Sequence, residues 1–492
     1  MSRISAHLLF LALICPTASA ADRPNIIFVL ADDLGWRDLG CTGSTFYETP
    51  NLDRLAGRGM RFTNAYAACP VCSPTRASIL TGEYPVRFPI TDYIPGNRRG
   101  KLNPPAYLHE LPTAEVTIAE ALKEAGYATA FIGKWHLGGP GFLPDRQGFD
   151  VNVGGSERGS PRSYFSPYQM PTLPDGPPGE YLTDRLTDEA VRFIEDSRRG
   201  DSPFFLYLSH YAVHTPLQAK PDLVQKYRTK AAQLPPPDGP AFLPEGGRTA
   251  RQIQDHPVYA AMVESLDQSI GRIKATLERL DLDDRTIVLL TSDNGGLSTS
   301  EGSPTSNVPL RAGKGWPYEG GIRVPLIVRW PGVSKPGAVC REPVISTDHF
   351  PTILEMTGGT PLPGRHLDGA SLVPLLKGGT RPERPLFWHY PHYGNQGGAP
   401  FGAVRLGDLK LIEWFEDDRV ELFDLRDDPG ETRNLAADRP ERATALRQRL
   451  RDWRASVNAR MPTPNPDFRP DATRPASSSS SPIQKNYTHP RN

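Results

Sequence analysis

Five runs of consecutive, mostly apolar residues limit what this chain can fold into. They are Asn25–Leu30, Tyr127–Ile132, Pro203–Leu208, Thr286–Leu290 and Val324–Trp330. Continuous apolar runs are typical of strands that are buried on both faces of a parallel sheet. Between the runs, segments 50–59, 117–124 and 257–280 carry the capping and periodicity signals of helices. The pattern predicts an α/β fold, in which a large, mostly parallel or mixed sheet is sandwiched by helices.

The end of the chain has a different pattern. A Gly- and Pro-rich stretch at 357–385 is typical of a connection between domains. After it we expect four short strands and one helix, at 386–390, 402–405, 409–414, 420–424 and 440–457. Because 492 residues exceed one ordinary core, we predict a large domain at 21–370 and a smaller C-terminal α+β domain at 371–460. This second domain combines a short antiparallel sheet with one helix, and the Pro- and Ser-rich residues 461–492 are predicted to be disordered.

The first twenty residues have the pattern of a secretory signal peptide. Arg3 precedes an apolar run at 8–14, and Ala18-Ser19-Ala20 supplies a small-residue cleavage site. The run is too short to span a membrane, and no later stretch is long and apolar enough to do so. The sequence therefore predicts a periplasmic or secreted protein with residues 1–20 removed and no membrane span.

The charge of the chain is balanced, with 56 Lys and Arg residues against 56 Asp and Glu residues. A protein that binds nucleic acid or an acidic membrane through bulk charge would carry an excess of positive charge. We therefore expect no nucleic-acid partner.

Charged and imidazole side chains follow four of the predicted strands at the point where each strand ends. They are Asp32, Asp33, Lys134, His136, His210, His214, Asp293 and Asn294. In open α/β sheets, sites form outside the carboxyl ends of the strands. Any one of these residues could belong to a solvated loop, but together they predict one shared pocket.

Four of these residues are oxygen donors of the kind that hard cations prefer: Asp32, Asp33, Asp293 and Asn294. Such a set suits Ca²⁺ or Mg²⁺ better than zinc. The alternative is that the two pairs are N-caps or turn residues with no metal.

Cys72 begins a segment with the features of a helix start. Ser73 is a candidate N-cap and Pro74 a candidate first helical residue. The amide groups of a helix start favour bound anions, and Arg76 adds a positive charge, so an anionic ester could lie against residue 72.

The cysteines leave other interpretations open. Cys69 and Cys72 form a C-x-x-C pair, which could be a redox pair, a disulfide or half of a zinc site. The chain has no second C-x-x-C, which makes zinc a poor fit. Without the signal peptide, Cys41, Cys69, Cys72 and Cys340 remain, and four cysteines in a chain of this size are not a disulfide framework.

Residues 72–82 read C-x-P-x-R-x-x-x-x-T-G, which resembles the signature of the type I, formylglycine-dependent sulfatases of the alkaline phosphatase superfamily. Gly133-Lys134-Trp135-His136-Leu137-Gly138 resembles the G-K-W-H-L-G motif of that family. Lys314 precedes a W-x-x-G-G-I-R-V-P run at 316–325, and 422–435 resembles the closing motif of bacterial sulfatases. The resemblance spans residues 23–457, with the motifs in family order, and is strongest to the bacterial sulfatases that degrade polysaccharides.

The resemblance implies a mechanism. A maturase of the host would oxidise Cys72 to formylglycine, whose hydrated aldehyde attacks sulfur. Ca²⁺, or Mg²⁺, would be held by residue 72 together with Asp32, Asp33, Asp293 and Asn294. Charge cancellation would come from Arg76, Lys134 and Lys314. In the family, the position of Lys134 also orients the formylglycine hydroxyls, that of His136 takes a proton from one of them, and that of His214 protonates the departing alcohol. His210 matches no family role, and we expect it to be structural.

The resemblance also implies a sulfated sugar as substrate, with galactose or N-acetylgalactosamine as the leading hypothesis. Loops 89–99, 152–167 and 388–395 offer polar side chains that could read the sugar. The candidates are Asp92, Arg158, Arg162, Tyr164, His389 and His392.

Three rival functions remain open. The first is a phosphate or phosphonate ester hydrolase on the same fold. The second is a non-catalytic glycan-binding protein in which Cys72 stays unmodified. The third is a secreted thiol–disulfide enzyme that uses Cys69 and Cys72.

Overall fold

The computed structural model of the protein describes residues 23–359 and 367–469. The predicted signal peptide, 1–20, lies outside these ranges, as does most of the predicted tail. Within the described ranges, no helix combines the length and the apolar character that crossing a bilayer requires.

The core is a nine-stranded sheet with strand order β11-β2-β10-β9-β1-β6-β4-β5, in which β12 also pairs with β2. Its strands are β1 (Asn25–Ala31), β2 (Met60–Tyr66), β4 (Ala128–Gly133), β5 (Val151–Val153), β6 (Phe204–Ser209), β9 (Thr286–Ser292), β10 (Arg323–Arg329), β11 (Ala338–Cys340) and β12 (Val344–Ile345). Strands β9, β1, β6, β4 and β5 run parallel to one another, whereas β10 is antiparallel to both β9 and β2. The predicted fold class is confirmed, and the sheet is mixed because β10 is reversed.

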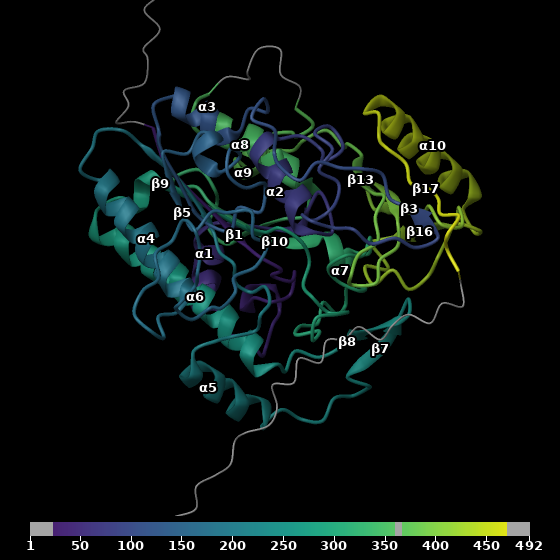
Figure 1. Ribbon diagram of the computed structural model, residues 1–492, viewed down its shortest axis with the longest axis horizontal. Coiled ribbons are helices and arrows are strands. Elements are labelled where there is room, and N and C mark those ends of the chain that lie inside the picture. The colour runs from purple at the N-terminus through teal and green to yellow at the C-terminus, as the bar shows by residue number, and fades with distance from the viewer. Residues whose placement is uncertain (1–22, 360–366, 470–492) are drawn as a thin grey trace, which may run out of the picture.

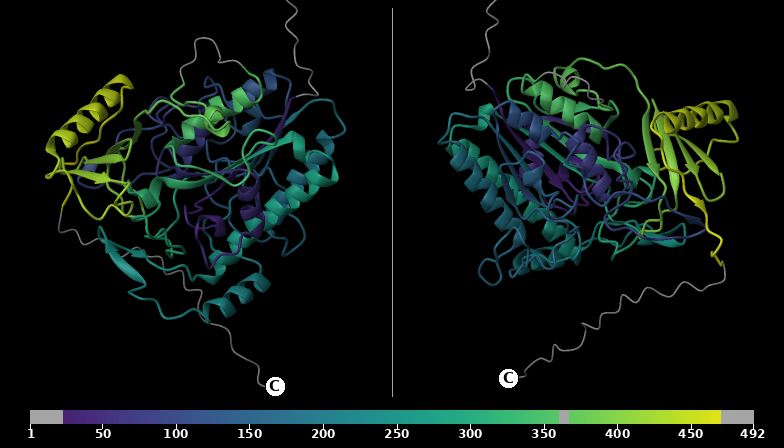
Figure 2. Two further views of the ribbon diagram at one scale, coloured as in Figure 1. Left: turned by 180° about the vertical axis from the view of Figure 1, so that it is seen from behind. Right: turned by 45° about the horizontal axis from the view of Figure 1, so that its top comes forward.

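Helices cover both faces of this sheet, as Figure 1 and the right-hand view of Figure 2 show. One face carries α1 (Pro50–Arg58), α4 (Leu182–Ser197), α5 (Pro221–Ala231) and α6 (Pro257–Arg279). The other carries α2 (Cys72–Thr81), α3 (Ile118–Glu124), α8 (His349–Met356) and α9 (Val373–Leu376). Strand β1 shows why its sequence is apolar throughout: Ile27 and Val29 point into the first layer, and Ile26, Phe28 and Leu30 into the second.

Short elements complete the described chain. Two-stranded pairs are β3 (Leu102–Asn103) with β17 (Thr463–Pro464), and β7 (Phe242–Glu245) with β8 (Arg248–Arg251). One turn of helix, α7, spans Glu319–Ile322, and 3₁₀ turns lie at Gly40–Thr42, Pro144–Arg146, Asp283–Arg285 and Ser346–Asp348.

The C-terminal unit is the predicted antiparallel sheet with one packed helix. Its strands follow chain order: β13 (Leu386–Tyr390), β14 (Phe401–Leu406), β15 (Leu409–Trp414) and β16 (Val420–Asp424), with α10 (Pro440–Ser456) against them. Its core is shared with the large unit, because Tyr66, Val71 and Trp316 pack into the same cluster. Helix α9 lies beyond the predicted boundary at residue 370, yet it packs in the core of the large unit.

We predicted disorder from residue 461 onward, but residues 463–465 pair with another segment of the chain. Thr463 and Pro464 pair with Asn103 and Leu102, and the amide of Asn465 donates to the carbonyl of Lys101 at 2.9 Å. A Pro-rich composition signals disorder as an average, but it does not prevent a short edge pairing. Residues 470–492 lie outside the described residues.

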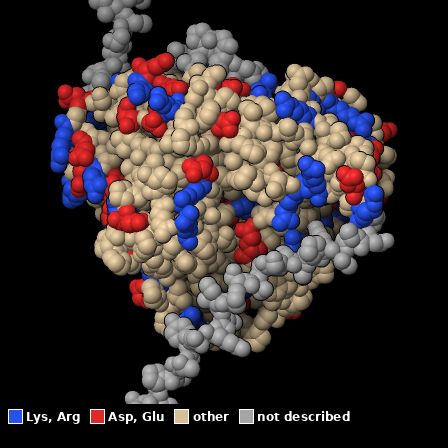
Figure 3. Space-filling model, in the orientation of Figure 1, with Lys and Arg blue, Asp and Glu red and all other residues tan. Residues whose placement is uncertain are grey.

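The surface carries charges of both signs (Figure 3). On the face shown in Figure 3, positive and negative side chains are interspersed, as the balanced composition predicts.

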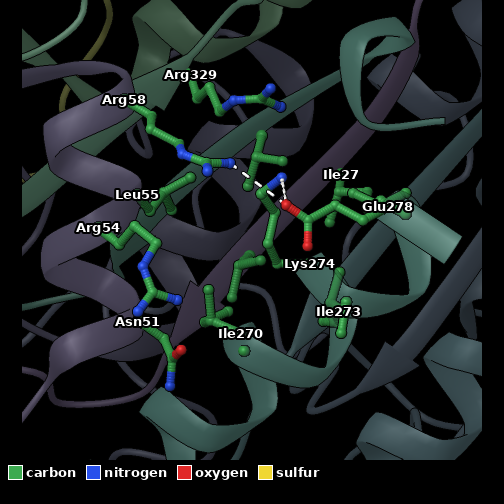
Figure 4. Close-up of a pocket in the computed structure, with 15 residues that line it drawn as sticks. Ile27, Asn51, Arg54, Leu55, Arg58, Ile270, Ile273, Lys274, Glu278 and Arg329 are labelled. Atoms are coloured by element: carbon green, nitrogen blue, oxygen red, sulfur yellow. Dashed lines mark hydrogen bonds and ion pairs between the residues drawn. The ribbon is translucent and has the colours of Figure 1, made fainter. Parts of the chain in front are cut away.

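A cavity of about 260 Å³ lies between α1 and α6, over Ile27 and Val29 of β1. Glu278 at its rim pairs with Arg58 at 3.5 Å and with Lys274 at 2.7 Å (Figure 4), which ties α6 to α1. No residue of the predicted site lines this cavity among the described residues.

A buried charge cluster joins the two units. Lys410 of β15, fully buried, contacts Glu319 of α7 at 3.0 Å and Glu431 at 2.9 Å. Burial opposes ionisation of Glu319, but Lys410, Arg323 and Arg405 outweigh it and lower its pKa to about 2. The amide of Glu319 donates to Glu431 at 2.6 Å, so one lysine holds two carboxylates at the junction.

Replacing this lysine with an apolar residue should destabilise the whole protein. In Lys410→Met, Glu319 and Glu431 would be left buried without their shared cation, and we expect a loss of about 3–5 kcal/mol in the free energy of unfolding. Urea unfolding followed by tryptophan fluorescence measures it. Lys335→Met removes an exposed lysine and is the matched control. Equal unfolding midpoints for the two variants would contradict a stabilising role for the cluster.

Candidate functional site

The predicted site residues converge at the carboxyl edge of the parallel strands. Asp32 and Asp33 follow β1, Lys134 and His136 follow β4, His214 follows β6, and Asp293 and Asn294 follow β9. Cys72 and Arg76 enter from α2, and Lys314 from the loop before α7. His210 lies apart: it is buried against the helix layer, with Nε2 3.0 Å from Ser269 Oγ of α6, as expected of a structural residue.

Helix α2 begins two residues earlier than the capping prediction. Val71 is the N-cap and makes no side-chain cap, so Cys72 is the first helical residue. Ser73 does not cap the helix; its Oγ accepts from the amide of Ile94 at 3.2 Å. Pro74 is therefore the third helical residue, where its missing N–H leaves no helical bond unmade. The change places residue 72 inside the first turn, whose free amides favour an anion.

Cys72 is buried, and its thiol is protonated at neutral pH. Its Sγ lies 3.8 Å from Asp32 Oδ1. Burial raises the pKa of the thiol to about 12, despite the nearby lysines Lys134 and Lys314. All four cysteines among the described residues are free, so Cys69 and Cys72 are not joined by a disulfide.

Three buried carboxylates alternate with three buried cations. Lys134 Nζ lies 2.7 Å from Asp32 Oδ2, and Lys314 Nζ lies 2.7 Å from Asp33 Oδ1. Arg76 contacts Asp293 Oδ2 at 2.8 Å through Nη2, and at 2.9 Å through Nε. Arg76 also donates to the carbonyl of Lys134 and to Ser209 Oγ, both at 2.8 Å.

The cations offset the effect of burial on the pKa of the carboxylates to different degrees. Burial would raise the pKa of all three, but Lys314 holds the pKa of Asp33 well below its usual range, and Arg76 lowers that of Asp293. For Asp32, burial outweighs Lys134 and raises the pKa to about 6. An additional cation beside Asp32 would favour its ionised form.

The donor set fits a hard divalent cation. Ligand atoms of Asp32, Asp33, Cys72 and His214 all lie within 4.8 Å of one another. Asn294 donates from Nδ2 to Asp33 Oδ1 at 2.8 Å, while its buried Oδ1 has no hydrogen-bond partner among the described residues. An unpartnered buried amide oxygen beside carboxylates is what a Ca²⁺ or Mg²⁺ ligand requires. Asp293, also predicted as a ligand, has its oxygens on Arg76 and on the amide of Asp33.

His136 is held as a neutral base. It adopts a left-handed backbone, with φ of 59°. Its Nε2 contacts the carbonyl of Ile94, which can only accept, so Nε2 carries the proton. Burial lowers the pKa of His136 well below its usual value, and its Nδ1 has no hydrogen-bond partner among the described residues. The ring therefore has an unused proton acceptor.

Gly133 allows this part of the site to form. It has φ of 111°, and a Cβ at this position would lie 1.8 Å from the carbonyl oxygen of Ser209. The same carbonyl accepts from the amide of Lys134 at 2.7 Å. Only glycine fits so close to the neighbouring strand, and the contact positions Lys134 and His136 at the end of β4.

A cavity of about 380 Å³ opens above these groups. Cys72, His136, His214 and Lys314 line it. Lys314 keeps its charge there: burial disfavours it, but Asp33, Cys72 and Glu301 raise the pKa of Lys314 well above its usual value. The cavity thus combines a buried cysteine, two imidazoles and a fixed ammonium group.

The three predicted loops reach the cavity, but through other residues than those predicted. Loop 89–99 contributes Tyr93, Ile94 and Pro95, loop 152–167 contributes Gly159 and Ser160, and loop 388–395 contributes Asn395. Glu301 and Gln396, which the sequence analysis did not single out, complete the lining. No sequence motif marks these two, because their position depends on how the loops fold together.

None of the six predicted substrate-binding residues lines this cavity in the described structure. Tyr390 donates to Asp92 at 2.7 Å, His392 contacts Thr91, and His389 contacts the carbonyl of Arg460. Buried polar groups need such partners: Asp92 and His392 link the two units, whereas His389 has its partner within the C-terminal unit.

The remaining predicted residues also have internal partners. Arg158 and Arg162 donate to Gln169. Tyr164 donates to the carbonyls of Tyr211 at 2.6 Å and His214 at 2.8 Å, so it supports the backbone of His214 from behind.

Comparison with known proteins agrees with this geometry. The Sulfatase family pattern matches residues 24–359, and that of the N-sulphoglucosamine sulphohydrolase C-terminal region matches 312–456. A sulfatase of Formosa agariphila is 33% identical, over 93% of this chain and 95% of its own. Human N-acetylgalactosamine-6-sulfatase is 36% identical, over 82% of this chain and 74% of its own.

A solved structure supports the same assignment. That of Ps i-CgsB in complex with k-i-k-neocarrahexaose has a TM-score of 0.72 and 29% identity, and the match covers 88% of this chain and 92% of that one. The chain is therefore a member of the sulfatase family and a sulfuric ester hydrolase.

Proposed function

We propose that the protein hydrolyses a sulfate monoester on a sugar, with residue 72 as the nucleophile. The observation that carries this proposal is Cys72 in the first turn of a helix, opening into a cavity that His136, His214 and Lys314 also line. A helix start and an ammonium group bind the anion, and the two imidazoles move protons.

An unmodified Cys72 is a poor nucleophile here. A thiol with a pKa of about 12 is almost entirely protonated at neutral pH, whereas reactive cysteines have a lowered pKa. This supports oxidation of Cys72 to formylglycine, which would supply a hydrated aldehyde as nucleophile. The thiol–disulfide alternative loses support for the same reason.

Asp32, Asp33, Asn294 and residue 72 would hold Ca²⁺, with Mg²⁺ as the alternative, and Asp293 would keep Arg76 in place beside them. The bound cation would add positive charge next to the sulfate oxygens and polarise the S–O bonds. Lys314, Lys134 and Arg76 neutralise the rest of the negative charge that gathers when an anionic ester is attacked.

The two histidines differ in what they can do with a proton. The free Nδ1 of neutral His136 can accept a proton from a hydroxyl on residue 72. His214 donates from Nδ1 to the carbonyl of Thr215 at 2.8 Å, which leaves Nε2 for the substrate. Nε2 lies 3.7 Å from Asp33 Oδ2 and His214 lines the cavity, so a proton on Nε2 can pass to the departing alcohol.

The shape of the cavity favours a sugar. Tyr93 and Pro95 offer apolar surface for the C–H groups of a ring, while Ser160, Asn395 and Gln396 offer hydrogen bonds for hydroxyls. Relatives are named for N-acetylgalactosamine 6-sulfate, and a structural neighbour binds a neocarrahexaose. Sulfated galactose or N-acetylgalactosamine is therefore the proposed substrate, and the pattern of residues 1–20 supports a periplasmic or secreted location.

The nucleophile can be tested directly by mass spectrometry. In protein from a host with a formylglycine-generating maturase, the peptide that contains residues 69–76 should be lighter by about 18 Da, the difference between a thiomethyl group and an aldehyde. Such protein should hydrolyse some of a panel of singly sulfated monosaccharides, and Cys72→Ser should not. An intact thiol in active protein, or turnover of aryl sulfates alone, would count against the proposal.

Metal binding can be measured without activity. After chelation with EDTA, adding Ca²⁺ should raise the free energy of unfolding, by about 2.7 kcal/mol at one hundred times the dissociation constant. Asn294→Ala removes the unpartnered amide oxygen and should weaken Ca²⁺ binding about tenfold or more in calorimetry. Asn97→Ala, at an exposed position, is the control. Unchanged Ca²⁺ affinity in Asn294→Ala would remove this residue from the site.

The role of His214 can be separated from binding by the leaving group. His214→Gln should lower kcat about 10²- to 10⁴-fold for sugar sulfates, whose alcohols need a proton as they depart. For p-nitrophenyl sulfate, whose leaving group is stable as an anion, the loss should be much smaller. His109→Gln, which changes an exposed histidine, should affect neither. Equal losses on both substrates would show that His214 is not the general acid.

A further inference from the structure

One side of the cavity is formed by three polar side chains that hold one another in place. Glu301 Oε1 accepts from Asn395 Nδ2 at 2.6 Å and from Gln396 Nε2 at 3.1 Å. Its other oxygen, Oε2, accepts from Thr215 Oγ1 at 3.4 Å. We refer to Glu301, Asn395 and Gln396 as the acceptor wall.

Gln396 is the most strongly fixed member of the acceptor wall. Its side chain is 2% exposed, and its backbone carbonyl accepts from Trp316 Nε1 at 3.1 Å and Thr299 Oγ1 at 3.2 Å. Because its Nε2 faces a carboxylate, Oε1 is the atom left over, and it has no hydrogen-bond partner among the described residues. A Cβ on Gly315 would lie 2.6 Å from Oε1, so this oxygen sits against the residue that follows Lys314.

The acceptor wall and the floor of the cavity differ in charge. At the floor, Arg76, Lys134 and Lys314 are each paired with a carboxylate, and the metal ion proposed to bind there would give the site of the sulfate group a net positive charge. Glu301 is the one carboxylate among the described residues that line the cavity. A hydroxyl or an amide N–H of the substrate could donate to Glu301, whereas a second sulfate or a carboxylate would face a fixed negative charge.

We propose that Glu301 is a specificity-determining residue that selects singly sulfated sugars and rejects those with a second anionic group on the side that faces the acceptor wall. The inference rests on the proposed function, since it assumes that the sulfate lies at the floor. The carboxylate is held by two amides in a partly buried position, where repulsion between like charges is screened less than in water. A sugar that offers hydroxyls on that side satisfies the acceptors instead of leaving them unpaired.

The test compares two inhibitors that differ by one sulfate group. N-acetylgalactosamine 6-sulfate and N-acetylgalactosamine 4,6-disulfate are measured as competitive inhibitors of p-nitrophenyl sulfate hydrolysis by the matured, Ca²⁺-loaded enzyme. We expect the monosulfate to bind at least about tenfold more tightly. Glu301→Gln should reduce this ratio about tenfold, and Glu301→Lys should reduce it further or reverse it.

Glu301→Gln removes the negative charge, and Glu301→Lys replaces it with a positive charge. A larger change of the affinity ratio in Glu301→Lys than in Glu301→Gln therefore identifies an electrostatic effect. Thermal unfolding midpoints establish that each variant is folded, and Glu441→Gln on the exposed side of α10 is the matched control, expected to keep the ratio of the unchanged protein. A ratio that does not respond to either substitution would overturn this inference. Hydrolysis of singly sulfated monosaccharides by the same protein would leave the proposed function intact. Failure to hydrolyse any sulfate ester after maturation would overturn both.

Discussion

Three buried carboxylates at the carboxyl edge of the main sheet determine how the surrounding elements are placed. An ionised carboxylate in a dry interior is costly unless a cation reaches it, so each needs a partner from another element. Arg76 comes from α2, Lys134 from the end of β4, and Lys314 from the loop before α7. Placing these cations also brings Cys72 to the same point, because it lies one helical turn before Arg76.

The cations outweigh the effect of burial on the pKa of two carboxylates, but not on that of the third. Asp33 and Asp293 have a lowered pKa, whereas burial keeps the pKa of Asp32 raised to about 6. Asn294, whose Oδ1 has no partner among the described residues, contacts the adjacent Asp33. A hard cation would meet both needs, so the donor set and the charge balance support the same proposal.

Much of the fold was predictable because it depends on local patterns. The apolar run of β1 and the capping box of Thr117 with Glu120 at the start of α3 act on neighbouring residues, and both elements form where expected. Strand β2 was missed because its residues are only partly buried and its sequence lacks an apolar run. The end of the chain was misjudged because the pairing of Thr463 with Asn103 depends on a distant segment.

The residues of the site that follow strands or belong to sequence motifs were predictable. The residues at the strand ends meet because parallel strands end at one edge, a rule that needs no side-chain detail. The loops proposed to contact the substrate were different: all three line the cavity, but Asp92 points inward to Tyr390 while Tyr93 lines the cavity. Which of two neighbouring loop residues faces a cavity depends on packing between loops, and no spacing in the sequence records it.

The acceptor wall is built from both structural units, since Glu301 belongs to the large unit and Asn395 and Gln396 to the loop after β13. That loop is anchored through its backbone, by Trp316 to the carbonyl of Gln396 and by Arg248 to the carbonyl of Asn395. Its side chains are therefore free to change in evolution without loosening the anchor. Substrate range can change through this loop while the floor, where three cations are paired with three buried carboxylates, keeps its charge balance.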